Sequence, residues 1–199
     1  MARPTYHHGD LRAALVRAGL DAIAENGLAA LSVADAARRT GVSPAAPYRH
    51  FPGRQALLAA TAVAAARELA ADLHAAIGDR AGTAPGAALA ATAAVYVRFL
   101  ARRGAGFDLI FAEELAGTDD PELQTAGREV VDLLLPLAMG VTGQDAPAAL
   151  LLLERHIAAA HGYGALYRCG FLRRRSTDVE VHAAAAEETT RMLVAAMAR

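Results

Sequence analysis

Apolar residues recur along most of the 199-residue chain at intervals of three and four, which is the spacing of one helix face. Near the N-terminus, Leu11, Leu15, Ala18 and Ala22 follow this spacing. Segments rich in glycine and proline separate the apolar runs, and we expect no strand. The pattern predicts nine helices, over residues 10–26, 32–41, 43–51, 54–77, 87–103, 107–116, 121–139, 148–167 and 177–198.

Capping residues and prolines define several of these helix ends. Gly27 follows the first helix and can adopt the positive φ of a helix terminus. Ser32 and Ser43 are expected to cap the second and third helices, and Pro44 takes the first position of the third, where a missing N–H costs nothing. The third helix must end before Pro52, because a residue that precedes proline avoids helical angles.

Composition supports a helical protein and shows an uneven distribution of charge. Hydrophobic residues make up 54% of the chain, and many are alanine, the best helix former. The formal net charge is −1, but residues 1–55 carry seven basic and four acidic residues, about +3, whereas residues 56–199 carry thirteen and seventeen, about −4. All the basic residues are arginine. The N-terminal part is therefore the better candidate for contact with an anionic partner.

Targeting signals and cysteine pairs are not evident in the chain. The N-terminus lacks the apolar stretch of a signal peptide, and no uncharged apolar run is long enough to span a membrane. The single cysteine, Cys169, cannot form an internal disulfide or a cysteine-based metal site. We therefore expect a cytoplasmic protein.

Two short predicted helices, over 32–41 and 43–51, are joined by a tight turn that contains Gly41, a pattern typical of a helix-turn-helix. The second helix of this motif lies in the major groove of DNA. Small residues at its start would allow close approach to thymine methyls, and the polar residues near its end would hold phosphates. The predicted DNA-binding residues are Ser32, Ser43, Pro44, Ala45, Ala46, Tyr48, Arg49, His50 and Arg54.

Arg54 and a small apolar core complete the predicted motif. Arg54 starts the fourth helix, where its charge can hold a phosphate beside the positive end of the helix dipole. Val33, Ala37, Val42 and Phe51 are expected to clamp the short helices together.

The segment LSVADAARRTGVSPAAPYRHFPGRQALLAA resembles the DNA-binding part of the TetR family of bacterial transcriptional regulators. The resemblance covers residues 10–60 and rests on the GVS turn, the Tyr48/Phe51 pair and the ALL that opens the fourth helix. The segments YHHGDLRAAL and HIAAAHGYGALYRCG are similar to a subgroup with a Trp-x-x-x-His-Gly signature. Here the tryptophan is absent, and the histidine–glycine pair is His161–Gly162.

This resemblance implies a homodimeric repressor that binds a palindromic operator in double-stranded DNA and is released by a small molecule. It implies an all-α fold with a three-helix DNA-binding domain over 1–55 and an effector-binding and dimerisation domain over 56–199. It also implies base contacts from Pro44, Ala45, Ala46 and Arg49, and phosphate contacts from Tyr48, His50 and Arg54.

Aromatic residues in the second part of the chain are candidates for an effector pocket, since such pockets are mostly apolar with a few polar groups. Phe107, Phe111 and Leu115 are spaced by four on one predicted helix. For each residue taken singly, the core of a helical bundle is the favoured interpretation. The predicted ligand residues are Tyr96, Phe99, Phe107, Phe111, Glu114, Leu115, His156 and Tyr163.

The last two predicted helices suit a dimer interface. The first is apolar nearly all round and carries small residues that allow close helix approach, and the second has a near-heptad apolar spacing. Two such helices from each subunit would form a four-helix bundle. The predicted interface residues are Leu151, Ala158, Ala159, Gly162, Ala165, Val181, Ala185 and Met192.

No enzymatic site, cofactor or metal is predicted. His156 and His161 are five residues apart, so they lie roughly 140° apart around a helix and do not converge on one metal ion. No phosphate-binding loop or nucleophile elbow is present. Two alternatives to a repressor stay open: a small-molecule binding protein whose helix-turn-helix has no DNA role, and an activator or general DNA-coating protein.

Overall fold

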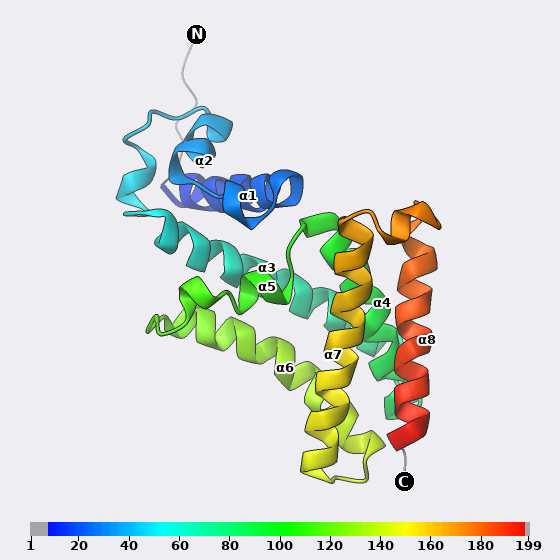
Figure 1. The fold of residues 1–199 in the computed structure, drawn as a ribbon. Helices are drawn as coiled ribbons and strands as arrows, with labels where there is room; N and C mark the ends of the chain where they lie inside the picture. The colour runs from blue at the N-terminus through cyan, green and yellow to red at the C-terminus, as the bar shows by residue number, and fades with distance from the viewer. Residues whose placement is uncertain (1–7, 198–199) are drawn as a thin grey trace. The chain divides into compact units, whose positions relative to one another are not determined.

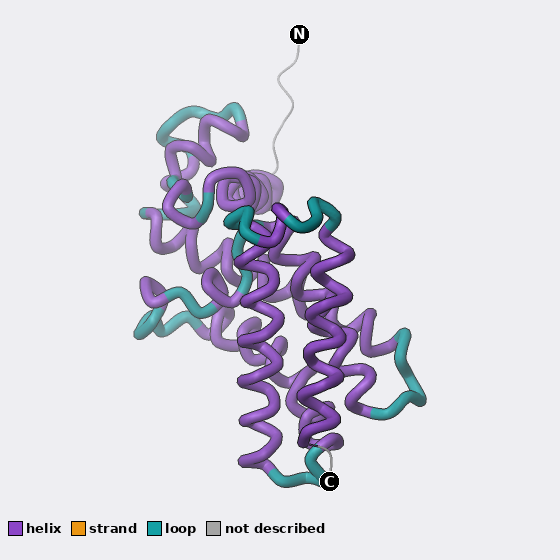
Figure 2. The backbone as a smooth tube through the Cα atoms, turned by 45° about the vertical axis from the view of Figure 1, so that its right-hand side comes forward, coloured by secondary structure: helices purple, strands orange, loops and turns teal. Residues whose placement is uncertain are grey.

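The computed structural model describes residues 8–197, and every regular element in this range is helical (Figure 1; Figure 2). The α-helices are α1 (His8–Asn26), α2 (Val33–Thr40), α3 (Arg54–Gly78), α4 (Pro85–Arg103), α5 (Phe107–Ile110), α6 (Pro121–Val141), α7 (Ala146–Arg168) and α8 (Val179–Met197). Short 3-10 turns are η1 (Leu28–Ala30), η2 (Pro47–Arg49), η3 (Glu113–Leu115) and η4 (Leu172–Arg174).

The described chain divides into two units, and α3 contributes residues to both of them. The first unit contains the residues up to Ala65 together with the segment Arg103–Leu123, which carries α5 and η3. The second unit contains Ala66–Arg102 and the residues from Gln124 onward, which include α7 and α8.

The core of the first unit joins α1, α2 and the start of α3. Its largest fully buried side chains are Leu15, Ile23, Leu31, Leu57 and Leu58, with Leu109 from α5. A Cβ added at Gly19 would lie only 3.0 Å from Leu31 Cδ1 and 3.0 Å from Thr61 Oγ1. The glycine therefore lets α1 pack directly against its neighbours.

In the second unit, α7 and α8 run side by side as an antiparallel pair (Figure 1; Figure 2). Glycines bring α4 close to both of them. A Cβ at Gly86 would lie 2.4 Å from Val194 Cγ1, and one at Gly164 would lie 2.5 Å from Leu100 Cδ2. Arg98 on α4 also forms a two-pronged ion pair with Glu180 on α8, with N–O distances of 2.6–3.0 Å.

The all-helical prediction is confirmed, but residues 8–197 contain eight α-helices where nine were expected. The missing one is the third, predicted over 43–51. Pro47 has no N–H to donate to the Ser43 carbonyl, as an α-helix starting there requires. The Ala46 N–H instead donates to Ser43 O at 3.0 Å, and η2 follows as a 3-10 turn without a side-chain cap. The sequence interpretation considered Pro44 and Pro52 and overlooked the effect of Pro47.

The single helix predicted over 107–116 is also wrong, because the chain turns at Ala112 between α5 and η3. A continuous helix would put Glu113 and Glu114 four residues after Leu109 and Ile110, on the face that is buried. The turn leaves both glutamates exposed and buries Leu115 instead.

One helix cap confirms a prediction from the sequence and a second corrects one. Ser32 Oγ accepts the Asp35 N–H at 3.0 Å, which confirms the predicted cap of α2. Asp145 caps α7 in the same way through the Ala148 N–H at 3.1 Å, so α7 begins two residues before the predicted start. None of the helices within 8–197 combines the length and apolar character needed to cross a bilayer.

Candidate nucleic-acid interface

The turn after α2 has the geometry expected of a helix-turn-helix. Gly41 adopts the left-handed conformation, with φ 70° and ψ 20°, which is unfavourable for residues with a side chain. The Val42 N–H donates to Ala37 O at 3.2 Å, so the chain leaves α2 in a tight turn. Val33, Ala37 and Phe51 are buried beneath the turn, as predicted for the small core of this motif, whereas Val42, its fourth predicted member, is only half-buried.

The segment 43–50 presents most of the predicted DNA-binding residues to solvent. Ser43, Pro44, Ala45 and Arg49 are exposed, and Tyr48 is 53% exposed. Ala46 and His50 are half-buried, as is Ser32 at the start of α2. Pro47 faces inward and is buried. Although this segment is a turn with one 3-10 element, it keeps the exposed surface that the predicted helix was expected to offer.

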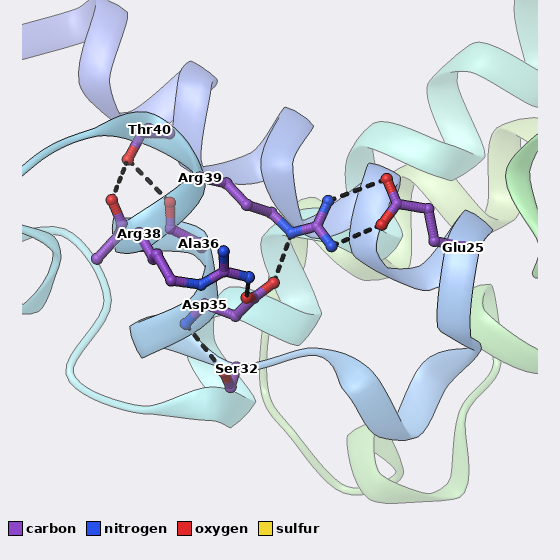
Figure 3. Close-up of polar contacts among 8 residues, drawn as sticks. Glu25, Ser32, Asp35, Ala36, Arg38, Arg39 and Thr40 are labelled. Carbon is purple, nitrogen blue, oxygen red and sulfur yellow. Dashed lines mark hydrogen bonds and ion pairs between the residues drawn. The ribbon is translucent and has the colours of Figure 1, made fainter.

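An ion-pair network, which the sequence interpretation missed, ties α2 to α1 (Figure 3). Asp35 pairs with Arg38 and with Arg39, whose Nε lies 2.5 Å from Oδ2. Arg39 also reaches Glu25 on α1 through two hydrogen bonds, at 2.7 and 3.1 Å. The hydrogen bonds from Arg39 lower the pKa of both carboxyl groups. The spacing of Asp35 to Arg38 and Arg39 is the three-and-four spacing of helical ion pairs and could have revealed half of the network.

Arg54, a predicted phosphate contact, is engaged within the protein. Its Nε donates to Leu31 O at 3.1 Å and its Nη2 donates to Leu28 O at 3.3 Å. Its Nη1 forms an ion pair with the Glu114 carboxylate on η3. These contacts join the start of α3, the approach to α2 and the η3 turn within the first unit.

The geometry of residues 15–61 coincides with a sequence match to a known family. These residues match the family model described as bacterial regulatory proteins, tetR family. The chain carries a tetR-family N-terminal domain. No curated protein sequence matches the chain.

Solved structures with a similar fold extend along almost the whole chain. A protein of unknown function from Rhodococcus sp. RHA1 is 29% identical, with a TM-score of 0.75, over 99% of this chain and 100% of its own. A TetR/AcrR-family transcriptional regulator from Thermobifida fusca is 21% identical, with a TM-score of 0.58, over 96% and 100%. SmeT, the repressor of a multidrug efflux pump of Stenotrophomonas maltophilia, is 19% identical, with a TM-score of 0.56, over 94% and 90%. The similarity to the last two of these proteins shows a shared fold alone, because each is less than 25% identical to this chain.

Outside the tetR-family domain, the predicted ligand residues fall into both units. Phe107 and Phe111 stack in the first unit, with ring centroids 5.6 Å apart, and Phe111 is 55% exposed. Leu115 is buried in the same unit, where the broken helix separates it from the two-ring stack. Tyr96 and Phe99 are buried in the second unit.

His156 lies in the core of the second unit between two threonines. The Thr92 hydroxyl donates its proton to Leu89 O at 2.6 Å, so it must accept the Nε2–H of His156 at 3.1 Å. The Nδ1 atom then accepts the Thr190 hydroxyl at 3.0 Å. Burial lowers the pKa of His156 to about 4, so the ring is neutral near pH 7 and Nδ1 can accept this hydrogen bond.

Other polar predictions in this unit also have protein partners. The Tyr96 hydroxyl lies 2.8 Å from His161 Nδ1, and the Tyr163 hydroxyl lies 3.2 Å from Thr189 Oγ1. An apolar cleft lies elsewhere, at the start of α4 and the ends of α6 and α8. It is lined by Ala84, Pro85, Gly86, Ala87, Gly140, Val141, Arg191, Val194 and Ala195, and these include no predicted ligand residue.

The exposed large apolar side chains of the second unit lie on α7, on α8 and, for Phe171, in the segment between them. Among the predicted interface residues, Leu151 and Val181 are each 41% exposed and Met192 is 59% exposed. Ala158 is exposed, and the remaining predicted members, which are half-buried, are Ala159, Gly162, Ala165 and Ala185. Leu150 and Leu166 are exposed on α7 as well and were not predicted.

Proposed function

We propose that the chain is a homodimeric transcriptional repressor that binds a palindromic operator and is released by a small molecule. The observation that carries this proposal is the exposed 43–50 segment at the end of a helix-turn-helix in a tetR-family domain. Pro44, Ala45 and Ala46 offer small apolar contacts, and Arg49 offers a forked donor for guanine. Such a protein acts on the chromosome, so we place it in the cytoplasm.

The exposed apolar surface of α7 and α8 supports a dimer. Leucine, valine and methionine side chains exposed on two adjacent helices are better buried against a second copy. A symmetric dimer also supplies two copies of the 43–50 segment, which matches the two half-sites of a palindrome.

Selection of bound fragments from genomic DNA tests the proposal, followed by affinity measurement on the enriched sequence and on its scrambled version. The wild type should prefer the enriched sequence by at least about a thousandfold, the lower end of the range of specific DNA-binding proteins. Arg49→Ala should lose preference at one base position, at a cost of about 1–3 kcal/mol per half-site. Arg128→Ala removes an exposed arginine from α6 and is the control for loss of charge alone.

Failure of the selection would overturn the proposal. A dimer that binds no sequence above background would be a small-molecule binding protein without a DNA role. Equal binding to enriched and scrambled DNA would instead indicate a general DNA-coating protein.

A further inference from the structure

The guanidinium of Arg54 donates to two kinds of acceptor, backbone carbonyls and a carboxylate, and the two have different effects. The carbonyls of Leu31 and Leu28 accept hydrogen bonds from Nε and Nη2 and fix the orientation of the planar group. The Glu114 carboxylate binds Nη1 and supplies a negative charge. A guanidinium has five N–H groups, so two remain after these three contacts.

Glu114 is attached to the start of α3 by a second contact. The Gln55 side-chain amide donates to the Glu114 carbonyl at 3.1 Å, so neighbouring residues on α3 hold both ends of this glutamate. The Arg54 and Glu114 side chains are 36% and 53% exposed, which leaves the pair open to an anion from outside. Glu113 precedes it, is exposed, and does not form the ion pair with Arg54.

We propose that Glu114 occupies Arg54 in place of an operator phosphate and thereby lowers the affinity of the protein for DNA. The inference rests on the proposed function, because it takes Arg54 as a phosphate contact. A phosphate that approaches the two remaining N–H groups meets the carboxylate beside them and is repelled. To bind the phosphate at full strength, Arg54 must release Glu114.

The direction of the effect follows from the carbonyl contacts. If Glu114 were needed to aim the guanidinium, neutralising it would weaken DNA binding. Because Leu31 and Leu28 already hold Nε and Nη2, neutralising Glu114 removes the competing charge and leaves the orientation intact. Glutamine at this position keeps the shape of the side chain and can still accept a hydrogen bond from Nη1.

The position of Glu114 in the chain also suggests how its competition with a DNA phosphate for Arg54 could be regulated. Glu114 follows the stacked Phe107–Phe111 pair on the same short segment of the first unit. A molecule that displaces this segment would change the distance between the carboxylate and Arg54, and with it the affinity for DNA. Glu114 therefore acts on DNA binding through Arg54, as a competitor for its guanidinium.

The test compares Glu114→Gln, Glu113→Gln, Arg54→Ala and the Arg54→Ala/Glu114→Gln double variant on the selected operator over a series of salt concentrations. Glu114→Gln should bind about two- to tenfold more tightly at low salt, as expected for one exposed ion pair in each subunit of a dimer. Its plot of log K against log salt should be steeper by about 1–2, because one more phosphate per subunit is neutralised. Glu113→Gln should stay close to the wild type in both measurements.

The double variant separates competition for Arg54 from a general effect of charge. In the Arg54→Ala background, Glu114→Gln should change neither the affinity nor the slope. A gain that persists without Arg54, or an equal gain in Glu113→Gln, would overturn the inference while leaving operator binding established. A wild type that selects no operator would instead overturn the proposed function.

Discussion

The buried His156 should make the stability of the protein depend on pH in a specific window. The residue is 2% exposed and is hydrogen-bonded to Thr92 and Thr190. Protonation would place a second N–H against the Thr190 hydroxyl and a positive charge in an apolar core. Burial therefore lowers the pKa of this histidine to about 4.

The direction of this pH dependence follows from the pKa of His156 in the folded and unfolded states. In the unfolded chain the histidine has its ordinary pKa of about 6.5. Above this value both states are neutral and the full stability is present. As the pH falls from about 6.5 toward 4, the unfolded state binds a proton that the folded state does not, and stability is lost. The loss is about 1.4 kcal/mol per pH unit and reaches roughly 3 kcal/mol at pH 4.

Urea unfolding between pH 7.5 and 4 measures this loss. We compare the wild type with His156→Leu, which cannot titrate, and with His74→Gln, which removes an exposed histidine from α3. His156→Leu should be less stable than the wild type at pH 7.5 by about 1–3 kcal/mol, because it leaves the Thr190 hydroxyl without its acceptor. The two free energies of unfolding should converge as the pH falls, whereas His74→Gln should follow the wild type throughout.

Exposed carboxylates titrate in the same range but are common to all three proteins, so the difference between the curves isolates His156. Curves for the wild type and His156→Leu that run parallel from pH 7.5 to 4 would refute the reasoning. They would mean that the folded protein accepts the proton as readily as the unfolded chain does.

Three further predictions concern the dimer, the aromatic pair and the 43–50 segment. Gly162→Glu should dissociate the proposed dimer in sedimentation, and it should keep its helix content because an added Cβ at Gly162 meets nothing within 4 Å in the protomer. Gly164→Ala should instead destabilise the protomer itself, because its Cβ would lie 2.5 Å from Leu100 Cδ2. In thermal unfolding, Phe111→Ala should lower the free energy of unfolding by less than about 1 kcal/mol and Phe99→Ala should lower it by about 3–5 kcal/mol, since Phe99 is fully buried and Phe111 is exposed. Pro47→Ala should restore the missing N–H and shift the NMR signals of 44–50 toward α-helical values; unchanged shifts would show that another residue prevents the helix.

The features that sequence predicted correctly depend on residues close together in the chain. Ser32 caps α2 through an amide three residues away, and Gly41 ends the same helix by its own backbone freedom. Seven of the nine predicted helices begin and end within two residues of the observed bounds for the same reason, whereas those predicted over 43–51 and 107–116 are wrong. Pro47 was equally local, but its effect was missed because the surrounding motif resembled one that contains a helix.

The contacts that sequence could not predict join residues far apart in the chain. Arg54 and Glu114 are separated by sixty positions, and Thr92 and His156 by sixty-four. Arg54 had a plausible local interpretation as a phosphate contact, and Glu114 and His156 each had one as a ligand contact. Only the packing of the helices shows that Arg54 has an internal anion and that His156 has two internal partners.

In the proposed interface, three arginines are paired with acidic residues, whereas the arginine that is expected to contact a base is not. Arg38 and Arg39 are compensated by Asp35 and Glu25, and Arg54 is compensated by Glu114. Arg49, in contrast, is exposed on the 43–50 segment and forms no ion pair with another described residue. Non-specific attraction to the DNA backbone is therefore weakened, while the one forked donor aimed outward from the turn keeps its full charge. Because Pro44, Ala45 and Ala46 carry no polar side chain, we expect the choice of operator to rest on Arg49 and on DNA shape, and the compensated arginines to help keep the protein off other sequences.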